Sequence, residues 1–125
     1  MKNVVDSSGW LAYFANEPSA DFFAPAIEEA SRLIVSAISV DEVFKHILVR
    51  RSEDEAMQAV GAMLQGQVIH LDGELALNAA KLSVENKLPM ADSIILATAY
   101  KFDAIVWTQD NDFEGLRNVR YLPKT

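Results

Sequence analysis

The sequence predicts an α/β protein, a three-layer α/β/α sandwich with a central parallel sheet. Short β-branched runs such as Val4–Val5 and Leu33–Val35 alternate along the chain with longer segments whose apolar residues recur at helical spacing. Such runs suit strands that helices cover on both faces. The chain has 125 residues, 50% of them hydrophobic, so we expect a single domain over residues 1–125.

The first expected element is a strand that ends at an acid. Residues 2–8 (KNVVDSS) form a short apolar run that is followed by Asp6 and two serines. In open parallel sheets, ligands bind outside the carboxyl ends of the strands, which makes Asp6 a candidate functional residue. The alternative is that Asp6 caps a helix that begins at Ser7 or Ser8, because aspartate beside serine also marks helix starts.

The remaining elements alternate along the chain as such a sheet requires. Strands are expected at residues 32–36, 67–71, 104–108 and 118–122. Helices are expected at residues 8–15, 19–30, 39–51, 52–65, 72–86 and 89–102. The strands are short runs with Val, Ile or aromatic residues, and the last of them, which precedes Pro123, is expected at the sheet edge.

Proline and capping residues set the expected helix boundaries. Pro18 ends the first helix, Pro25 is expected to shorten or kink the second, and Pro89 fixes the junction before the last. The third helix carries apolar residues on one face and opens with Ser39 and Glu42 at capping-box spacing. Glu42 therefore has an alternative, purely structural role as a capping residue.

Composition argues against several classes of protein. No run of about 18 apolar residues is present, and the N-terminus lacks the pattern of a secretory signal, so we expect a cytoplasmic protein without membrane association. The absence of cysteine excludes disulfides, thiolate metal sites and cysteine nucleophiles. Eighteen acids against 11 bases give a net charge of −7, which argues against a generic nucleic-acid binder. Two divalent cations on an acid cluster would change this to −7 + 4 = −3 and make that site attractive to phosphate.

Four acids occupy positions that are unusual for surface charge. Asp6 and Asp110 directly follow buried strands, whereas Glu42 and Asp92 lie in the first turns of apolar helices. The i+3, i+4 and i+7 neighbours of Asp92 are apolar, so its carboxylate is expected to face inward, where an unpaired charge is costly. If the first and fourth strands are neighbours, Asp6 and Asp110 face each other across the crevice.

A cluster of carboxylates retains protons unless cations neutralise it. Mg²⁺ and Mn²⁺ prefer oxygen ligands and keep several waters. Two such ions can activate a water for attack on a phosphodiester and stabilise the leaving oxygen. The acids therefore indicate a Mg²⁺ or Mn²⁺ site with nuclease chemistry.

Four segments carry these acids in a familiar order. The segments VVDSS, SAISVDEV, LPMADSIILATA and TQDNDF resemble the four acidic motifs of PIN-domain ribonucleases. Length and motif order are most similar to VapC-like toxins, the toxin half of VapBC-type toxin–antitoxin pairs. The resemblance spans essentially the whole chain.

The resemblance implies a sheet ordered 3-2-1-4-5 and Mg²⁺- or Mn²⁺-dependent endonucleolytic cleavage of RNA, with tRNA or rRNA as candidate substrates. It also implies inhibition by a cognate antitoxin protein and a homodimer. Carried over residue by residue, the acids that bind metal and act in catalysis are Asp6, Glu42, Asp92 and Asp110, and Asp112 is an accessory metal-binding acid. Motif spacing favours Glu42 over its neighbour Asp41. Ser7 and Thr108 match hydroxyl positions where a contact to a metal ligand or to phosphate is expected.

Other interpretations stay open at this stage. A catalytically weak PIN-like binding module or regulatory protein would retain the same acids. A receiver-like phosphotransfer domain lacks support, because no suitable lysine follows the second to fourth strands. His46 could approach the site, although a lone histidine on a helix is more often structural. The basic residues Lys45, Arg50 and Arg51 could contact RNA phosphates, and the arginines could equally complement a helix C-terminus.

Overall fold

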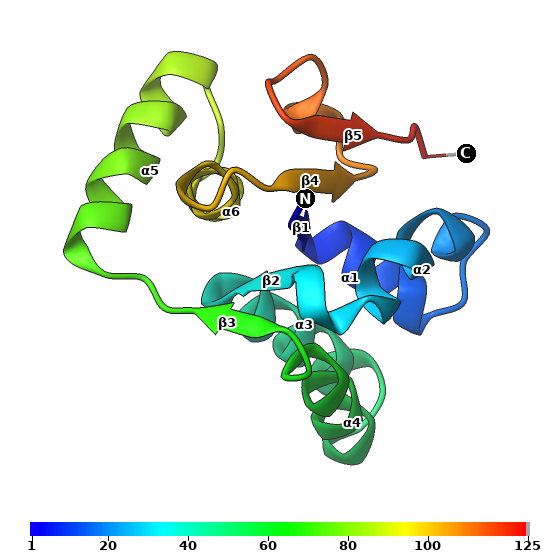
Figure 1. Cartoon of the computed structure of the whole chain (residues 1–125). Coiled ribbons are helices and arrows are strands. Elements are labelled where there is room, and N and C mark those ends of the chain that lie inside the picture. Colours follow the sequence, from blue (N-terminus) through cyan, green and yellow to red (C-terminus); the bar gives the residue numbers. More distant parts are fainter. Residues whose placement is uncertain (125) are drawn as a thin grey trace.

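The computed structural model describes residues 1–124, which form an α/β/α sandwich around a parallel sheet (Figure 1). The strands are β1 (Asn3–Val5), β2 (Leu33–Ser36), β3 (Gln67–Ile69), β4 (Ile105–Thr108) and β5 (Val119–Tyr121). The helices are α1 (Ser7–Phe14), α2 (Ala20–Glu28), α3 (Ala37–Arg50), α4 (Glu53–Met63), α5 (Gly73–Asn86) and α6 (Met90–Lys101), with short 3-10 helices η1 (Ala30–Arg32) and η2 (Asn111–Phe113). The predicted fold class is confirmed.

The strand order is β3-β2-β1-β4-β5, and every neighbouring pair is parallel. The central strand β1 pairs with β2 on one side and β4 on the other, where Val4 is aligned with Ile34 and Val106 respectively. The chain adds β2 and β3 on one side of β1 and then crosses to β4, so the order reverses at β1. This reversal leaves a crevice at the carboxyl ends of β1 and β4, as predicted.

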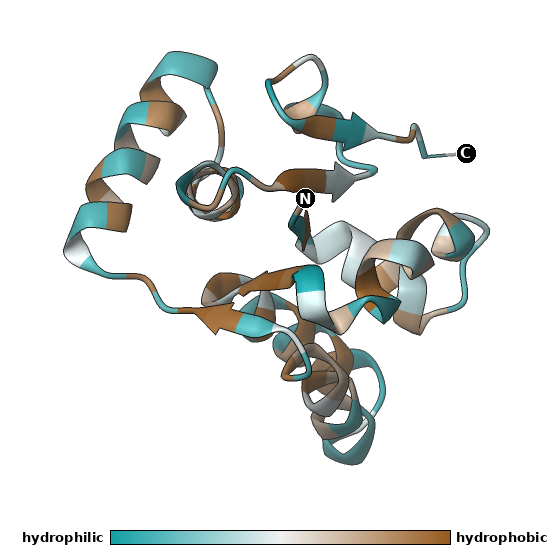
Figure 2. Ribbon diagram, viewed as in Figure 1, coloured by the Kyte–Doolittle hydropathy of each residue, from teal (hydrophilic) through white to brown (hydrophobic). Residues whose placement is uncertain are grey.

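Alternate residues of β1 face two different helical layers. Val5 packs into a core that contains Trp10 of α1 and residues of α2, α3 and α4, whereas Val4 packs with Ile95 and other residues of α6. Figure 2 shows the apolar strands β2, β3 and β4 between helices that carry polar residues on their outer sides. Trp10 is 0% exposed within this core. The central strands β1 and β2 are therefore covered on both faces, which explains their apolar residues.

The start of α3 differs from the prediction. The helix begins at Ala37 with Ser36 in the N-cap position, three residues before the expected Ser39. Ser39 is completely buried within the first turn, so the predicted capping box of Ser39 and Glu42 is wrong. The reason is tertiary: β2 runs directly into α3 without a loop, and this fixes the helix start before the local capping signal is reached.

Proline shortens α2 without breaking it. Pro25 lies inside the helix, which ends at Glu28 and is followed by η1. Because proline has no N–H, α2 lacks one backbone hydrogen bond in its first half. No helix within residues 1–124 is long and apolar enough to cross a membrane.

Close packing of α1 against its neighbours requires a glycine. A Cβ atom at Gly9 would lie 2.6 Å from a ring carbon of Phe23 and 2.7 Å from a methyl carbon of Val5. Real Cβ atoms do not approach other atoms so closely, so only glycine lets α1 lie at this distance from β1 and α2. The position of α1 in turn fixes the place of Asp6, which lies between β1 and α1.

Candidate metal centre

Asp6 lies at the end of β1 and is 2% exposed. Its carboxylate caps α1 by accepting the N–H of Gly9 at 2.9 Å, and it also accepts the hydroxyl of Ser8 at 2.8 Å. The capping role considered from the sequence is therefore confirmed. The cap does not use the whole carboxylate, because Oδ2 also accepts the hydroxyl of Thr108, on β4, at 2.8 Å.

Thr108 joins the ends of β1 and β4. Its buried hydroxyl donates to Asp6 and accepts the backbone N–H of Asp110 at 2.9 Å. Asp110 then caps η2 by accepting the N–H of Asp112 at 2.9 Å. One hydroxyl therefore orients Asp6 and positions the turn that carries Asp110 and Asp112.

Three acids converge directly beside this turn. Asp92, in the first turn of α6, and Asp110 and Asp112 each offer one carboxylate oxygen, and these oxygens all lie within 4.8 Å of one another. Asp92 and Asp110 are half-buried, and Asp112 is exposed. Three oxygens at this separation, open to water on one side, fit a hard divalent cation such as Mg²⁺ or Mn²⁺.

The pKa values of two of these acids are raised. Burial is the main cause for Asp6, whose pKa rises from 3.8 to about 6 although the hydrogen bonds from Gly9, Thr108 and Ser8 oppose the shift. Burial is also the main cause for Asp92, whose pKa rises from 3.8 to about 7. The charge of Asp110 and a hydrogen bond to Asp112 add to the shift of Asp92. The negative charges therefore oppose one another across the crevice.

No ion pair within residues 1–124 offsets this repulsion. The ion pairs within residues 1–124 join Arg32 to Glu29, Lys45 to Asp41, Arg51 to Glu55 and Lys101 to Asp72. None involves an acid of the crevice. Buried or half-buried carboxylates without a basic partner are the arrangement that a bound cation would stabilise.

Glu42 lies beside the cluster rather than within it. Its half-buried carboxylate accepts the hydroxyl of Ser7 at 2.6 Å, and Ser7 directly follows Asp6 in the chain. Asp41 is exposed and pairs with Lys45 at 3.9 Å, so it lies on a different face of α3. The structure thus places Asp92, Asp110 and Asp112 together, connects Asp6 through Thr108, and connects Glu42 through Ser7.

Two residues of the site received no role from the sequence. Ser8 donates to Asp6, as described above. Gln109 is 5% exposed, accepts the hydroxyl of Ser19 at 2.7 Å and donates to the backbone oxygen of Ser8 at 3.4 Å. The sequence could have indicated both residues only by their position, because each lies within two positions of an acid of the crevice. Sequence alone does not show which neighbouring side chains turn inward.

Known structures share this arrangement of elements. A toxin–antitoxin complex from Klebsiella pneumoniae matches with a TM-score of 0.80 and 24% identity, over 95% of this chain and 96% of that chain. VapC20 of Mycobacterium tuberculosis, described as a Sarcin-Ricin loop cleaving toxin, matches with a TM-score of 0.78 and 20% identity, over 94% and 97%. DNA-bound VapBC from Salmonella typhimurium matches with a TM-score of 0.76 and 18% identity, over 98% of both chains.

At these identities the structural matches establish the fold. Among curated proteins, none matches the chain by sequence. The family model of the PIN domain, in contrast, matches residues 4–118, which include most of β1, all of β4 and every acid of the crevice. The chain therefore belongs to the PIN domain family.

Proposed function

We propose that the protein is a Mg²⁺- or Mn²⁺-dependent endoribonuclease and the toxin of a toxin–antitoxin pair. The observation that carries this proposal is the convergence of carboxylates from α6 and from the turn after β4, beside the buried Asp6. Within residues 1–124 no ion pair involves these carboxylates. Membership of the PIN domain family supports nuclease chemistry. Similarity in fold to VapC20 and to VapBC complexes supports the role of a toxin.

Each acid has a distinct part in this proposal. Asp92, Asp110 and Asp112 hold the metal, and Asp6 adds a carboxylate from the opposite side of the crevice. Glu42 accepts the hydroxyl of Ser7 and lies near the same end of β1. There its carboxylate would serve as a ligand for a second metal ion or as an acceptor for a water molecule. Thr108 keeps Asp6 and the turn at Asp110 in register. Bound divalent metal supplies a water of lowered pKa and stabilises the leaving oxygen of the phosphodiester.

Purified protein incubated with total cellular RNA tests the activity. Discrete fragments are expected with Mg²⁺ or Mn²⁺, and none with EDTA. The Asp92→Asn variant keeps the shape of the side chain but removes one charge from the cluster, so it should lose cleavage while its circular dichroism spectrum stays unchanged. Asp41→Asn, on the outer face of the neighbouring helix α3, is the matched control and should cleave like the wild type.

Two outcomes would contradict the proposal. Full metal-dependent activity of Asp92→Asn would refute the assignment of the site. Binding of Mn²⁺ in calorimetry without cleavage of any cellular RNA would favour a PIN-like binding module or regulatory protein.

The partners follow from the same proposal. The fold is shared with proteins solved as toxin–antitoxin complexes, which supports a cognate antitoxin that binds this chain. We further propose a homodimer that acts on tRNA or rRNA in the cytoplasm. Co-expression with the neighbouring open reading frame tests the antitoxin, and light scattering of the purified chain tests the dimer.

A further inference from the structure

A groove of about 960 Å³ lies between α1, α3 and α4. Its walls include apolar residues of α1 and α3, among them Phe14 and Ile47. Arg50, Arg51 and Lys124 also line it, together with Glu17 and Glu55, although the chain as a whole carries a net charge of −7. A hollow of an acidic protein in which bases outnumber acids is a place where an anion is favoured.

The groove continues into the proposed metal centre. Ser8 and Gln109 line both this groove and a second hollow of about 400 Å³, which also includes Asp110. Ser8 donates to Asp6, so the end of the groove contacts the residues of the crevice directly. The groove and the hollow at Asp110 therefore adjoin one another at Ser8 and Gln109.

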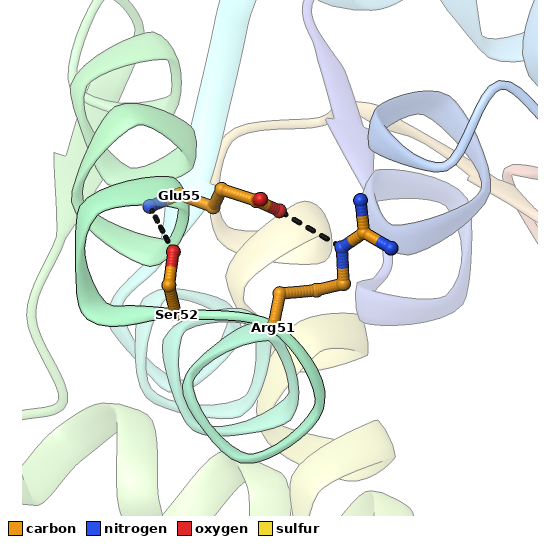
Figure 3. A network of polar contacts seen from close by, with 3 residues as sticks. All are labelled: Arg51, Ser52 and Glu55. Carbon is orange, nitrogen blue, oxygen red and sulfur yellow. Dashed lines mark hydrogen bonds and ion pairs between the residues drawn. The ribbon is translucent and has the colours of Figure 1, made fainter.

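The sequence offered three basic residues as candidates for phosphate contacts, namely Lys45, Arg50 and Arg51, on α3 and at its C-terminal end. In the structure their surroundings differ. Lys45 lies outside the groove and pairs with Asp41 at 3.9 Å. Arg51 lines the groove, but its Nε donates to Glu55 at 3.0 Å, and Glu55 is in turn held by the cap of Ser52 (Figure 3). The charge of Arg51 is already compensated.

Arg50 differs from both. It lines the groove, and no carboxylate within residues 1–124 pairs with it. Its Nη1 lies 3.1 Å from Nδ1 of His46, one helical turn earlier. Arginine has no acceptor, so His46 must accept this hydrogen bond and is neutral when the bond forms. Burial and the charge of Arg50 lower the pKa of His46, and the charge of Glu17 opposes this shift.

We propose that Arg50, oriented by His46, binds a non-scissile phosphate of the RNA strand whose scissile phosphate lies at the acidic crevice. The proposal rests on the proposed ribonuclease function. The guanidinium keeps N–H groups that point to no protein acceptor within residues 1–124, and a phosphate accepts two of them at once. Arg50 is therefore a positioning residue and takes no part in the cleavage step.

RNA explains the groove better than an acidic peptide does. The groove is continuous with a centre that, once metal is bound, attracts phosphate. A single RNA strand carries a phosphate at every nucleotide, so a strand held at the crevice places further phosphates along its path. The apolar wall at Phe14 offers a surface on which a base can stack.

Cleavage of total cellular RNA with Mn²⁺ by the wild type and by Arg50→Gln tests the proposal. Initial rates are measured over a range of RNA concentrations and of KCl concentrations. For Arg50→Gln we expect an apparent KM about tenfold higher with kcat within about twofold of the wild type, because one charge-assisted contact to bound RNA is lost. The slope of log(kcat/KM) against log[KCl] should become shallower by about 0.7, the value for one phosphate contact on a single strand.

Two variants serve as controls. Arg50→Lys retains the charge, so the salt slope should return to that of the wild type while KM recovers in part. Arg32→Gln removes an arginine that is paired with Glu29 and does not line the groove. It changes the net charge as Arg50→Gln does, and it should leave KM within about twofold of the wild type and the salt slope unchanged.

The outcomes separate this proposal from the one on which it rests. If the wild type cleaves RNA and Arg50→Gln has the same KM and salt slope, Arg50 does not bind phosphate although the ribonuclease function stands. If Arg50→Gln instead weakens only the complex with a co-expressed partner protein, the groove is a protein site and the proposal fails. If kcat and the melting temperature fall together in both Arg50→Gln and Arg50→Lys, the residue is structural. Absence of cleavage by the wild type removes both proposals.

Discussion

Replacement of Asp92 by asparagine should stabilise the metal-free protein. In the native state Asp92 is half-buried and faces the charges of Asp110, Asp112 and Asp6, and its pKa is raised from 3.8 to about 7. At pH 8 the carboxylate is ionised in both the folded and the unfolded chain, and only the folded chain suffers the repulsion. Asparagine keeps the shape without the charge, so the folded state is relieved.

The size of the effect follows from the pKa shift. A rise from 3.8 to about 7 corresponds to about 4 kcal/mol at 1.36 kcal/mol for each pH unit. Water reaches this half-buried group and screens the interaction, so we expect about 2 kcal/mol in the free energy of unfolding at pH 8. For a chain of 125 residues this raises the melting temperature by about 8 °C, at about 4 °C for each kcal/mol.

The raised pKa of Asp92 also fixes how the free energy of unfolding changes with pH. A raised native pKa means that the folded protein binds a proton that the unfolded chain has lost, so stability falls as pH rises from 3.8 through about 7. The advantage of Asp92→Asn should therefore be absent at pH 4 and complete at pH 8. Because residues 1–125 are proposed to form a single domain, one cooperative transition is expected in each case.

Thermal and urea unfolding in EDTA, followed by circular dichroism at pH 4, 6 and 8, measures these differences. Asp41→Asn, on an exposed face of α3, should stay within about 0.5 kcal/mol of the wild type. With excess Mn²⁺ the order should reverse, because the wild type gains the free energy of metal binding and the variant loses a ligand. A lower stability of Asp92→Asn than of the wild type at pH 8 in EDTA would refute the reasoning.

Three further predictions concern the rest of the centre. Thr108→Val keeps the shape of the side chain but removes the donor to Asp6. It should lower the free energy of unfolding in urea by about 1–3 kcal/mol and lower kcat for RNA cleavage. Unchanged stability would show that water replaces the hydroxyl. Gly9→Ala places a methyl group 2.6 Å from Phe23 and should lower the free energy of unfolding by about 1–3 kcal/mol, whereas Gly61→Ala, with open space at its Cβ, should not. In EDTA the melting temperature of the wild type should fall between pH 5 and pH 8, and Mn²⁺ at pH 8 should restore it; a rise with pH would contradict the raised pKa values.

The acids differ in how far sequence patterns could predict their surroundings. Asp92 was expected to face inward from its apolar i+3 and i+4 neighbours, and burial is indeed the main cause of its raised pKa. The role of Asp112 came from resemblance alone, and its position within 4.8 Å of Asp92 and Asp110 depends on how η2 folds back after β4. The capping-box interpretation of Glu42 was wrong, since α3 begins at Ala37 with Ser36 as its N-cap, and Glu42 contacts Ser7 instead.

Local periodicity and motif order determined the fold class and the strands and helices within a few residues, and they indicated which acids are candidates for the site. These properties depend on spacing along the chain, which a sequence displays directly. The tertiary structure alone decided that Thr108 joins Asp6 to Asp110 and that a groove adjoins them. It also decided that Arg51 pairs with Glu55, whereas no carboxylate within residues 1–124 pairs with Arg50. These contacts join residues brought together only by packing, and the pKa shifts arise from burial and opposed charges that no stretch of sequence contains.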